Sequence, residues 1–291
     1  MTKFFSLING KFKDSISVLD RGLAYGDGFF ETMLWKRKHP GATFDSAGVE
    51  FWQRHVKRIK KGCHLLQIKF PNPSTLIKYK QKILSRACNS GLKDGILKIL
   101  ITRGQGGRGY KFEKNITPTV IFLVFPKKKI GQNFFDKGVK VRFCKSSLST
   151  NNDFAGLKHL NRLDSVLARS EWVDDYFEGI LLDQQENLIE GTMTNIFFIK
   201  KNKLYTPSII DSGIEGIMRG VVMESYKNFF KKIKLTKIHK KDLENFDEMF
   251  LTNSVLKILP VRQMGRKKFK ISENTKNFMN FLRTKKNLEF I

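Results

Sequence analysis

The chain has 291 residues, of which 41% are hydrophobic, enough for one large domain or two modest ones with hydrophobic cores. No apolar run approaches the ~20 residues of a membrane-spanning helix, and the opening MTKFFSLINGKF holds too short an apolar stretch for a signal peptide, so we expect a cytoplasmic protein. The net charge of +27 makes nucleic acid the first partner to consider, but the basic residues are scattered along the chain rather than gathered in one segment. We therefore expect neither a nucleic-acid nor a membrane partner.

The cysteines and histidines lack the spacing of a metal or redox site. Cys63, Cys88 and Cys144 are widely separated and include no C-x-x-C pair. None of the five histidines is spaced from a cysteine or an acid as zinc ligands are. The sequence therefore predicts free thiols and no metal.

The first part of the chain predicts short strands and two helices. Asn9-Gly10 lies between two short apolar runs, which is typical of a tight hairpin turn. The glycine-rich DRGLAYGDG precedes an alternating, strand-like FFETMLW, and it lacks the lysine and Ser/Thr of a P-loop. From Phe51 to Ile68 apolar residues recur at gaps of four and three, which predicts a helix with one buried face. A second helix is predicted over Ser74 to Cys88, and two strands over Asp94 to Thr102 and Pro118 to Phe125, with RGQGGRGY between them.

A polar, glycine-containing segment from Lys127 to Gly138 predicts a domain boundary. It gives a small N-terminal α/β domain, residues 1–127, and a larger C-terminal domain, residues 128–291, that carries Lys158. There we expect a strand at VKVRFC, a helix after Lys158, and an antiparallel meander of EGILLD, NLIEGTMTNIFFIK and NKLYTP. Further on, we predict a helix beginning near Gly216, strands at DEMFLTNS and ILPVRQM, and a helix around Asn274 to Lys285.

Lys158 lies in AGLKHLNRLDSVLARSEW, just ahead of an apolar series spaced as one face of an amphipathic helix: Leu160, Leu163, Val166 and Leu167. A lysine held at a strand-to-helix junction suits covalent attachment of an aldehyde cofactor. An amine reacts in this way only as the neutral species, so its pKa must be lowered by burial or by nearby cations. In so lysine-rich a chain the alternative is a solvated surface lysine.

Five separated segments resemble the class IV, or fold-type IV, pyridoxal-phosphate enzymes, which include branched-chain and D-amino-acid aminotransferases and aminodeoxychorismate lyase. They are LDRGLAYGDGFFET, HVKR, GLKHLNRLDSVLARSEW, EGTMTNIFFI with LYTP, and GIEGIMRG followed by FLTNSVLKILPV, and they span Asp20 to Val261. The resemblance implies a two-domain α/β fold with antiparallel-rich sheets and flanking helices. It also implies pyridoxal 5′-phosphate as the cofactor and a homodimer as the assembly.

The resemblance further implies which residues hold the cofactor. Lys158 matches the lysine that binds pyridoxal phosphate covalently, and Glu190 matches the acid that pairs with the pyridine nitrogen and keeps the ring an electron sink. Asn195 belongs to the same EGTMTN motif. An arginine, N–H groups at a helix start and a hydroxyl bind the phosphate in the family; the matching residues are Arg58, for which Arg54 is an alternative, Gly216, Ile217 and Thr252.

Two segments, ITRGQGGRGY and AGLKHLNRLDSVLARS, resemble the aminodeoxychorismate lyases within this family. They imply conversion of 4-amino-4-deoxychorismate to 4-aminobenzoate and pyruvate in folate biosynthesis. The alternative is a branched-chain or D-amino-acid aminotransferase, and a remote one is a basic nucleic-acid-binding protein on an enzyme fold.

The glycine-flanked Arg103 and Arg108 are candidates for binding substrate carboxylates from a mobile loop. Their alternative is an ordinary hairpin loop with exposed arginines. Tyr25 and Asn253 are weaker substrate-binding candidates. The stretch RKHPGATFDSAGVEF is longer than the family outline has here, which bears on specificity.

Overall fold

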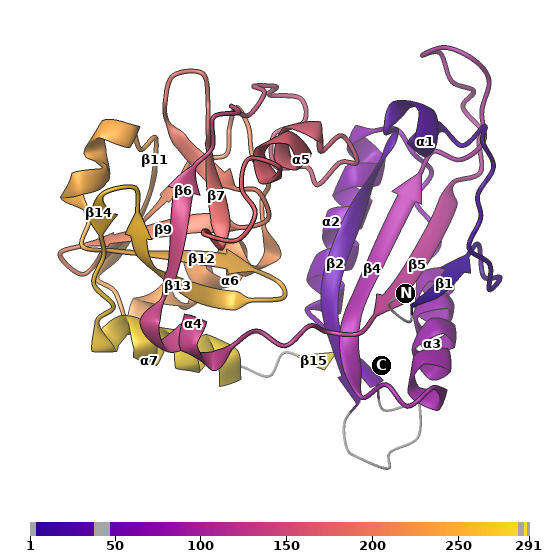
Figure 1. Cartoon of the computed structure of the whole chain (residues 1–291). Coiled ribbons are helices and arrows are strands. Elements are labelled where there is room, and N and C mark those ends of the chain that lie inside the picture. The colour runs from indigo at the N-terminus through magenta and orange to yellow at the C-terminus, as the bar shows by residue number, and fades with distance from the viewer. Residues whose placement is uncertain (1–3, 38–46, 285–287, 290–291) are drawn as a thin grey trace. The chain divides into compact units, whose positions relative to one another are not determined.

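A computed structural model of the chain describes residues 4–37, 47–284 and 288–289 (Figure 1). Most of RKHPGATFDSAGVEF therefore lies outside the described residues, although its end forms a strand. The chain divides into two compact units. Unit 1 comprises Met1–Lys128, Lys158–Asn161 and Lys286–Ile291, and unit 2 comprises Lys129–Leu157 and Arg162–Lys285.

The segment that contains Lys158 belongs to unit 1, whereas the sequence assigned it to the C-terminal domain. The reason is backbone pairing with the start of β2 (Gly28–Arg37). The Phe30 N–H donates to the Lys158 carbonyl at 3.0 Å, and the Leu160 N–H donates to the Gly28 carbonyl at 3.0 Å. Two backbone hydrogen bonds therefore fix Lys158 against the sheet of unit 1.

Unit 1 is an antiparallel sheet with strand order β1-β5-β4-β2-β3-β15. Helices α2 and α3 pack on it (Figure 1). The Asn9-Gly10 turn is confirmed, because both residues have positive φ and Ile8 pairs with Lys11 across it. The elements are β1 (Phe5–Ile8), α1 (Arg21–Tyr25), β3 (Ala47–Glu50), α2 (Trp52–Leu65), α3 (Pro73–Asn89), β4 (Asp94–Thr102), β5 (Thr119–Phe125) and β15 (Leu288–Glu289).

The two faces of the unit 1 sheet differ. Along β4, Leu97, Ile99 and Ile101 are buried in the cluster that contains the helix side chains. The residues between them, including Lys98, are only half-buried. This alternation is the period of two that a strand imposes. The second face of this strand is thus less buried than the first.

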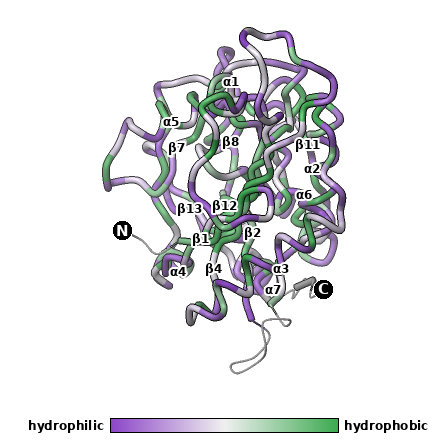
Figure 2. Tube along the Cα trace, turned by 90° about the vertical axis from the view of Figure 1, so that its right-hand side faces the viewer, coloured by the Kyte–Doolittle hydropathy of each residue, from purple (hydrophilic) through white to green (hydrophobic). Residues whose placement is uncertain are grey.

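Unit 2 is a mixed sheet with strand order β11-β10-β9-β12-β13-β6-β7-β8, and β14 pairs with β13. Strands such as β12 carry much of the hydrophobic colour in Figure 2. The elements are α4 (Gln132–Lys137), β6 (Val139–Phe143), α5 (Leu163–Arg169), β7 (Glu178–Leu182), β8 (Leu188–Gly191), β9 (Asn195–Lys200), β10 (Lys203–Pro207), α6 (Ile217–Ser225), η2 (Tyr226–Asn228), β11 (Lys232–Thr236), η3 (Lys240–Asn245), β12 (Glu248–Asn253), β13 (Lys257–Met264), β14 (Lys267–Lys268) and α7 (Glu273–Thr284).

The predicted meander is wrong in its order. The β7–β8 and β9–β10 hairpins form, but β12, β13 and β6 lie between them in the sheet. Hydrophobic alternation identifies strands without specifying their neighbours, because all strands of a buried sheet have similar hydrophobic sequences. The predicted linker also contains a short helix, α4.

The predicted helix after Lys158 forms, but its apolar face is exposed. Helix α5 starts at Leu163, so Leu160 precedes it. Leu163, Val166 and Leu167 are 74%, 60% and 60% exposed, and Ala168 is the residue that packs inward. The apolar spacing therefore identifies one side of α5 correctly, but no described residue buries that side.

No helix in the described ranges is long and apolar enough to cross a membrane.

Candidate active site

The predicted site residues fall in both units, and each part has its own geometry. In unit 1, Lys158 is half-buried and its Nζ lies 4.3 Å from the centre of the Phe30 ring. The isolated bridge between Phe29 and His159 places His159 opposite Phe29, so Lys158 stands opposite Phe30 on the second face of the sheet. Lys158 is thus a positioned lysine, in contrast to a solvated one.

A buried acid, Glu31, holds two basic side chains of α2. Its carboxylate accepts from Arg58 Nε and Nη2, both at 2.6 Å, and lies 2.6 Å from His55 Nδ1. The side chains of Glu31, His55 and Arg58 are 2%, 1% and 11% exposed. Arg58, predicted as a phosphate ligand, is therefore fixed in orientation by a bidentate ion pair.

Glu31 and His55 are site residues that the sequence interpretation missed. The available signal was an acid in FFETM at a position that, between Phe29 and Met33, should face the core. Such a buried acid needs partners, and the HVKR helix supplies them.

The pKa values of this cluster define its charges. Burial alone would raise the pKa of Glu31, but the charges of Arg58 and His55 and their hydrogen bonds outweigh burial and lower it to about 2. Burial lowers the pKa of His55, and the charges of Arg58 and Lys158 act in the same direction against Glu31. The other ring nitrogen of His55, Nε2, is buried and has no hydrogen-bond partner among the described residues.

In unit 2, Glu190 and Asn195 frame the start of α6. Glu190 is 3% exposed and accepts from the Ile214 N–H at 2.8 Å and from Asn195 Nδ2 at 3.3 Å. Asn195 Nδ2 also donates to the Ile214 carbonyl at 2.8 Å. A Cβ at Gly216 would lie 2.0 Å from Asn195 Oδ1, so only glycine fits there. The helix itself begins at Ile217, as predicted.

Glu178 organises the turn beside Glu190 and is another residue that the sequence did not reveal. Its fully buried carboxylate accepts from the N–H and hydroxyl of Thr192, the hydroxyl of Thr194, and the N–H groups of Met193 and Gly179, at 2.6–3.1 Å. Burial raises the pKa of Glu178, and these donors act in the opposite direction. The EGTMTN turn is thus tied to β7 by one side chain.

Thr252 does not present its hydroxyl as predicted. The side chain is fully buried and donates to the Lys257 carbonyl at 2.5 Å. Asn253 is also engaged, because its Oδ1 accepts from the Val255 and Leu256 N–H groups. Ser254, the other hydroxyl-bearing residue of this turn, is half-buried, in contrast to Thr252, which makes Ser254 the better candidate for an anion.

Arg103 is buried and hydrogen-bonded within unit 1. It is 6% exposed and donates to both oxygens of Asp27 and to the carbonyls of Leu66 and Gln67, while its guanidinium lies 3.6 Å from the Phe112 ring centre. These contacts occupy the guanidinium within the protein, and substrate binding by Arg103 stays a prediction. The bidentate contact with Asp27 and the two backbone carbonyls fix the orientation of its guanidinium group.

The RGQGGRGY loop is anchored at its base by Arg21, which is also ion-paired to Asp27. Arg21 donates to the carbonyls of Gly109 at 2.9 Å and Tyr110 at 3.2 Å. The hydroxyl of Tyr25 accepts from the Gly109 N–H at 3.0 Å. Tyr25 therefore holds the loop, while Arg108 is exposed on it and retains a side chain that can reach a ligand.

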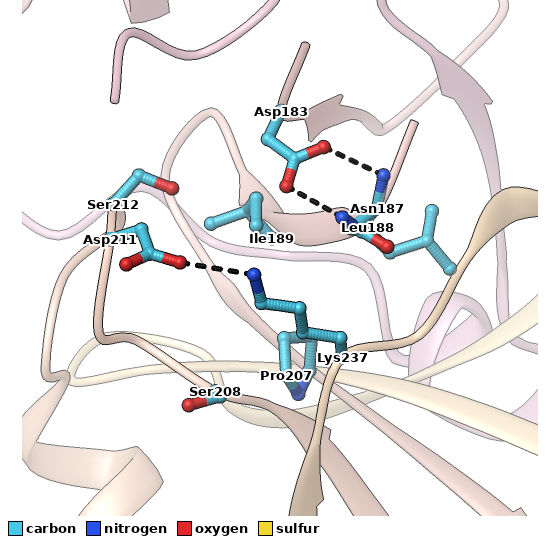
Figure 3. A pocket seen from close by; sticks show the side chains of 9 residues that line it. All are labelled: Asp183, Asn187, Leu188, Ile189, Pro207, Ser208, Asp211, Ser212 and Lys237. Carbon is cyan, nitrogen blue, oxygen red and sulfur yellow. Dashed lines mark hydrogen bonds and ion pairs between the residues drawn. The ribbon is translucent and has the colours of Figure 1, made fainter. Parts of the chain in front are cut away.

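A small hollow in unit 2 lies apart from these residues (Figure 3). Ion-paired Asp211 and Lys237, 3.2 Å apart, and the Asp183–Asn187 hydrogen bonds occupy its walls. Its lining includes none of the predicted site residues.

Comparison with known proteins places the fold. The model of the class IV aminotransferase family matches residues 28–264. The chain belongs to the class IV aminotransferase family. The chain is 31% identical to an aminodeoxychorismate lyase of Vibrio harveyi, over 91% of this chain and 93% of that one. It is 30% identical to a Methanocaldococcus jannaschii protein, over 87% and 85%, whose name of branched-chain-amino-acid aminotransferase is itself provisional.

A solved structure supports the same family. The crystal structure of 4-amino-4-deoxychorismate lyase from Pseudomonas aeruginosa superposes with a TM-score of 0.85 at 31% identity, covering 97% of this chain and all of that one. The predicted fold-type IV architecture, with mixed sheets and flanking helices, is confirmed. The chain is thus an enzyme of a pyridoxal-phosphate-dependent family.

The side chains of both units fit the cofactor of the class IV family. Unit 1 offers a positioned lysine and a fixed arginine, and unit 2 offers a buried carboxylate beside a helix start. No side chain of the described residues caps α6, so an anion could accept from its first N–H groups. Within unit 1 the lysine suits an aldehyde and the arginine suits a phosphate, and within unit 2 the carboxylate suits a pyridine nitrogen.

The three cysteines are free and buried, as predicted. Burial raises the pKa values of Cys63 and Cys144 to about 12, so neither thiol is ionised at neutral pH. Within the described residues, no group of three or more His, Cys, Asp or Glu side chains could hold a metal ion.

Proposed function

We propose that the protein is an aminodeoxychorismate lyase that converts 4-amino-4-deoxychorismate to 4-aminobenzoate and pyruvate in folate biosynthesis. The observation that carries the proposal is similarity to two such lyases over more than nine-tenths of each chain. The LKHLNR segment, which resembles the lyases, is also the one that fixes Lys158 to β2.

In this proposal the cofactor binds covalently at Lys158. Within unit 1, Arg58 is proposed for its phosphate. Within unit 2, Glu190 is proposed for its pyridine nitrogen, and the α6 start and Ser254 are proposed for its phosphate. Bound pyridoxal phosphate supplies an aldehyde for the substrate amine and a ring that accepts electron density. The carboxylate of Glu190 would pair with a protonated pyridine nitrogen. Hydrogen bonds from the Ile214 N–H and from Asn195 fix the position of this buried carboxylate. Asn195 thus serves the cofactor through Glu190.

Lys158 carries the proton transfers. After the substrate amine has replaced it, the Nζ of Lys158 removes the proton from the ring carbon that bears this amine. The C–O bond between the ring and the enolpyruvyl group then breaks, and formation of the aromatic ring drives this step. The released enolate takes the proton from the Nζ of Lys158 and becomes pyruvate. For Lys158 to act as a base it must be neutral.

A branched-chain aminotransferase is the second candidate, and the 30% identity to the Methanocaldococcus jannaschii protein favours it. It would use the same Lys158 and Glu190. The lyase needs no amino acceptor, because it releases pyruvate in a single half-reaction. An aminotransferase requires a 2-oxo acid to accept the amino group.

The test is 4-aminobenzoate release by purified protein with and without 2-oxoglutarate. We expect release without the oxo acid and none from Lys158→Ala. Borohydride reduction followed by peptide mass spectrometry should place the cofactor on the wild-type peptide containing Lys158. Release only when 2-oxoglutarate is present would favour the aminotransferase, and an unlabelled Lys158 would end the proposed role of that residue.

We also propose a homodimer, which the family resemblance implies. It is supported by the exposed apolar side chains of Val18, Leu19 and Leu23 in unit 1, at 80%, 63% and 64% exposure. Light scattering after size exclusion would measure about twice the 33.8 kDa chain mass, and a monomer at enzymatic concentrations would contradict this assembly.

A further inference from the structure

A second lysine lies on the same face of unit 1 as Lys158. Lys98 stands opposite Thr32 in the β2–β4 register, and Leu100 stands opposite Phe30. Side chains at these positions project from one face of the sheet. Lys98 Nζ lies 4.8 Å from the centre of the Phe30 ring, which Lys158 Nζ approaches at 4.3 Å. The two nitrogens are therefore at most about 9 Å apart, the sum of these distances.

Lys98 has an unbalanced charge. It forms no hydrogen bond or ion pair with the residues that the structure describes, and its polar contact is the Phe30 ring. The nearest core acid, Glu31, faces the opposite side of β2 and is committed to His55 and Arg58. Burial lowers the pKa of Lys98. A half-buried cation without an acid partner gains more from an anionic ligand than an exposed lysine does.

We propose that Lys98 binds a carboxylate of the substrate, with the substrate ring against Phe30 and its amine at Lys158. This inference rests on the proposed function. In 4-amino-4-deoxychorismate the amine and the ring carboxylate lie on opposite sides of a six-membered ring, so one molecule can reach both lysines. A branched-chain amino acid carries its carboxylate on the carbon that bears the amine and cannot do so. Lys98 thus selects substrates whose carboxylate is remote from the amine.

The experiment measures binding separately from turnover. Chorismate has a hydroxyl in place of the amine, so it keeps both carboxylates but cannot bond to the cofactor. Its dissociation constant is measured by calorimetry with the cofactor-loaded wild type, Lys98→Met, Lys98→Arg and the control Lys93→Met, whose lysine is exposed just before β4. The KM and kcat for 4-aminobenzoate release are measured on the same proteins.

We expect Lys98→Met to raise the dissociation constant of chorismate and the KM at least tenfold, because a hydrogen bond to a charged group is lost. The kcat should change less, Lys98→Arg should recover most of the affinity, and Lys93→Met should stay within twofold of the wild type. An unchanged cofactor absorbance band and melting temperature in Lys98→Met would locate the effect in substrate binding.

Two outcomes overturn the inference: chorismate affinity that is the same with and without the Lys98 charge, or an equal loss for 4-methylvalerate, a small monocarboxylate. A wild type that releases no 4-aminobenzoate would refute the proposed function by itself. The chorismate titration would still decide whether Lys98 binds a remote carboxylate, so the two failures are distinguishable.

Discussion

Replacing Glu31 with glutamine tests the buried cluster of unit 1. The substitution keeps the size of the side chain, but its amide group would turn a donor towards Arg58 or His55, which are themselves donors at 2.6 Å. A pKa of about 2 in the folded chain, against 4.5 ordinarily, corresponds to about 3 kcal/mol of stabilisation. Removing one partner of a buried ion pair costs about 3–5 kcal/mol, so we expect Glu31→Gln to lose about 3 kcal/mol at pH 7.

The assay is urea unfolding followed by tryptophan fluorescence. Trp35 and Trp52 are buried in unit 1, and Trp52 lies one turn before His55 on α2, so the signal reports this unit. Glu113→Gln, which removes an exposed acid, is the control and should change the unfolding free energy by less than about 0.5 kcal/mol.

The pH dependence has a defined sign. Because the folded pKa of Glu31 lies below the unfolded one, its contribution is present above about pH 4.5 and is lost as the pH falls through about 2. The difference between wild type and Glu31→Gln should therefore be about 2 kcal/mol smaller at pH 3 than at pH 7. A loss below about 1 kcal/mol at pH 7, or a difference that grows on acidification, would refute the reasoning.

Three more substitutions test other contacts. Asp27→Asn removes the acid shared by two buried arginines, so trypsin should cleave the 103–118 loop at least fivefold faster; an unchanged rate would mean that the loop is held otherwise. Glu178→Gln weakens the five hydrogen bonds to its carboxylate and should lower the unfolding free energy by about 2–3 kcal/mol in urea, against no change if the turn is self-supporting. Lys203 faces a lysine on each neighbouring strand, so Lys203→Glu should stabilise the protein by about 0.5 kcal/mol, a gain that 1 M salt removes and that should be absent if these side chains do not interact.

Local periodicity was sufficient for most elements. The apolar residues of α2 recur at helical spacing because its inner face, including Ile59 and Cys63, packs on the sheet. Strand β4 was predicted over the residues that form it, because its alternation follows the two faces of the sheet. The sequence pattern shows which side of an element is apolar. In α2 and β4 that apolar side is buried.

The same pattern failed at α5, where the apolar side is exposed. Helix α5 has seven residues, and Ala168 is the one that is buried. Thr252 failed for a related reason: its hydroxyl and that of Ser254 differ by two positions in the sequence, and only the turn shows which is already hydrogen-bonded. Spacing carries no information about what covers a side chain.

The pairing of Lys158 with β2 explains why the candidate site could be named from the sequence but not built from it. Motifs near Lys158 and Phe30 are recognisable separately, but the hydrogen bond between their backbones joins parts of the chain that are distant in sequence. That bond, together with the β2–β4 register, brings Lys98 to the ring that Lys158 also approaches. In the sequence Lys98 is one lysine among many, and its lack of an acid partner appears only when the sheet is assembled. The charge of Lys98, which no described acid balances, beside the lysine proposed to hold the cofactor is therefore the structural feature that most directly addresses the proposed substrate.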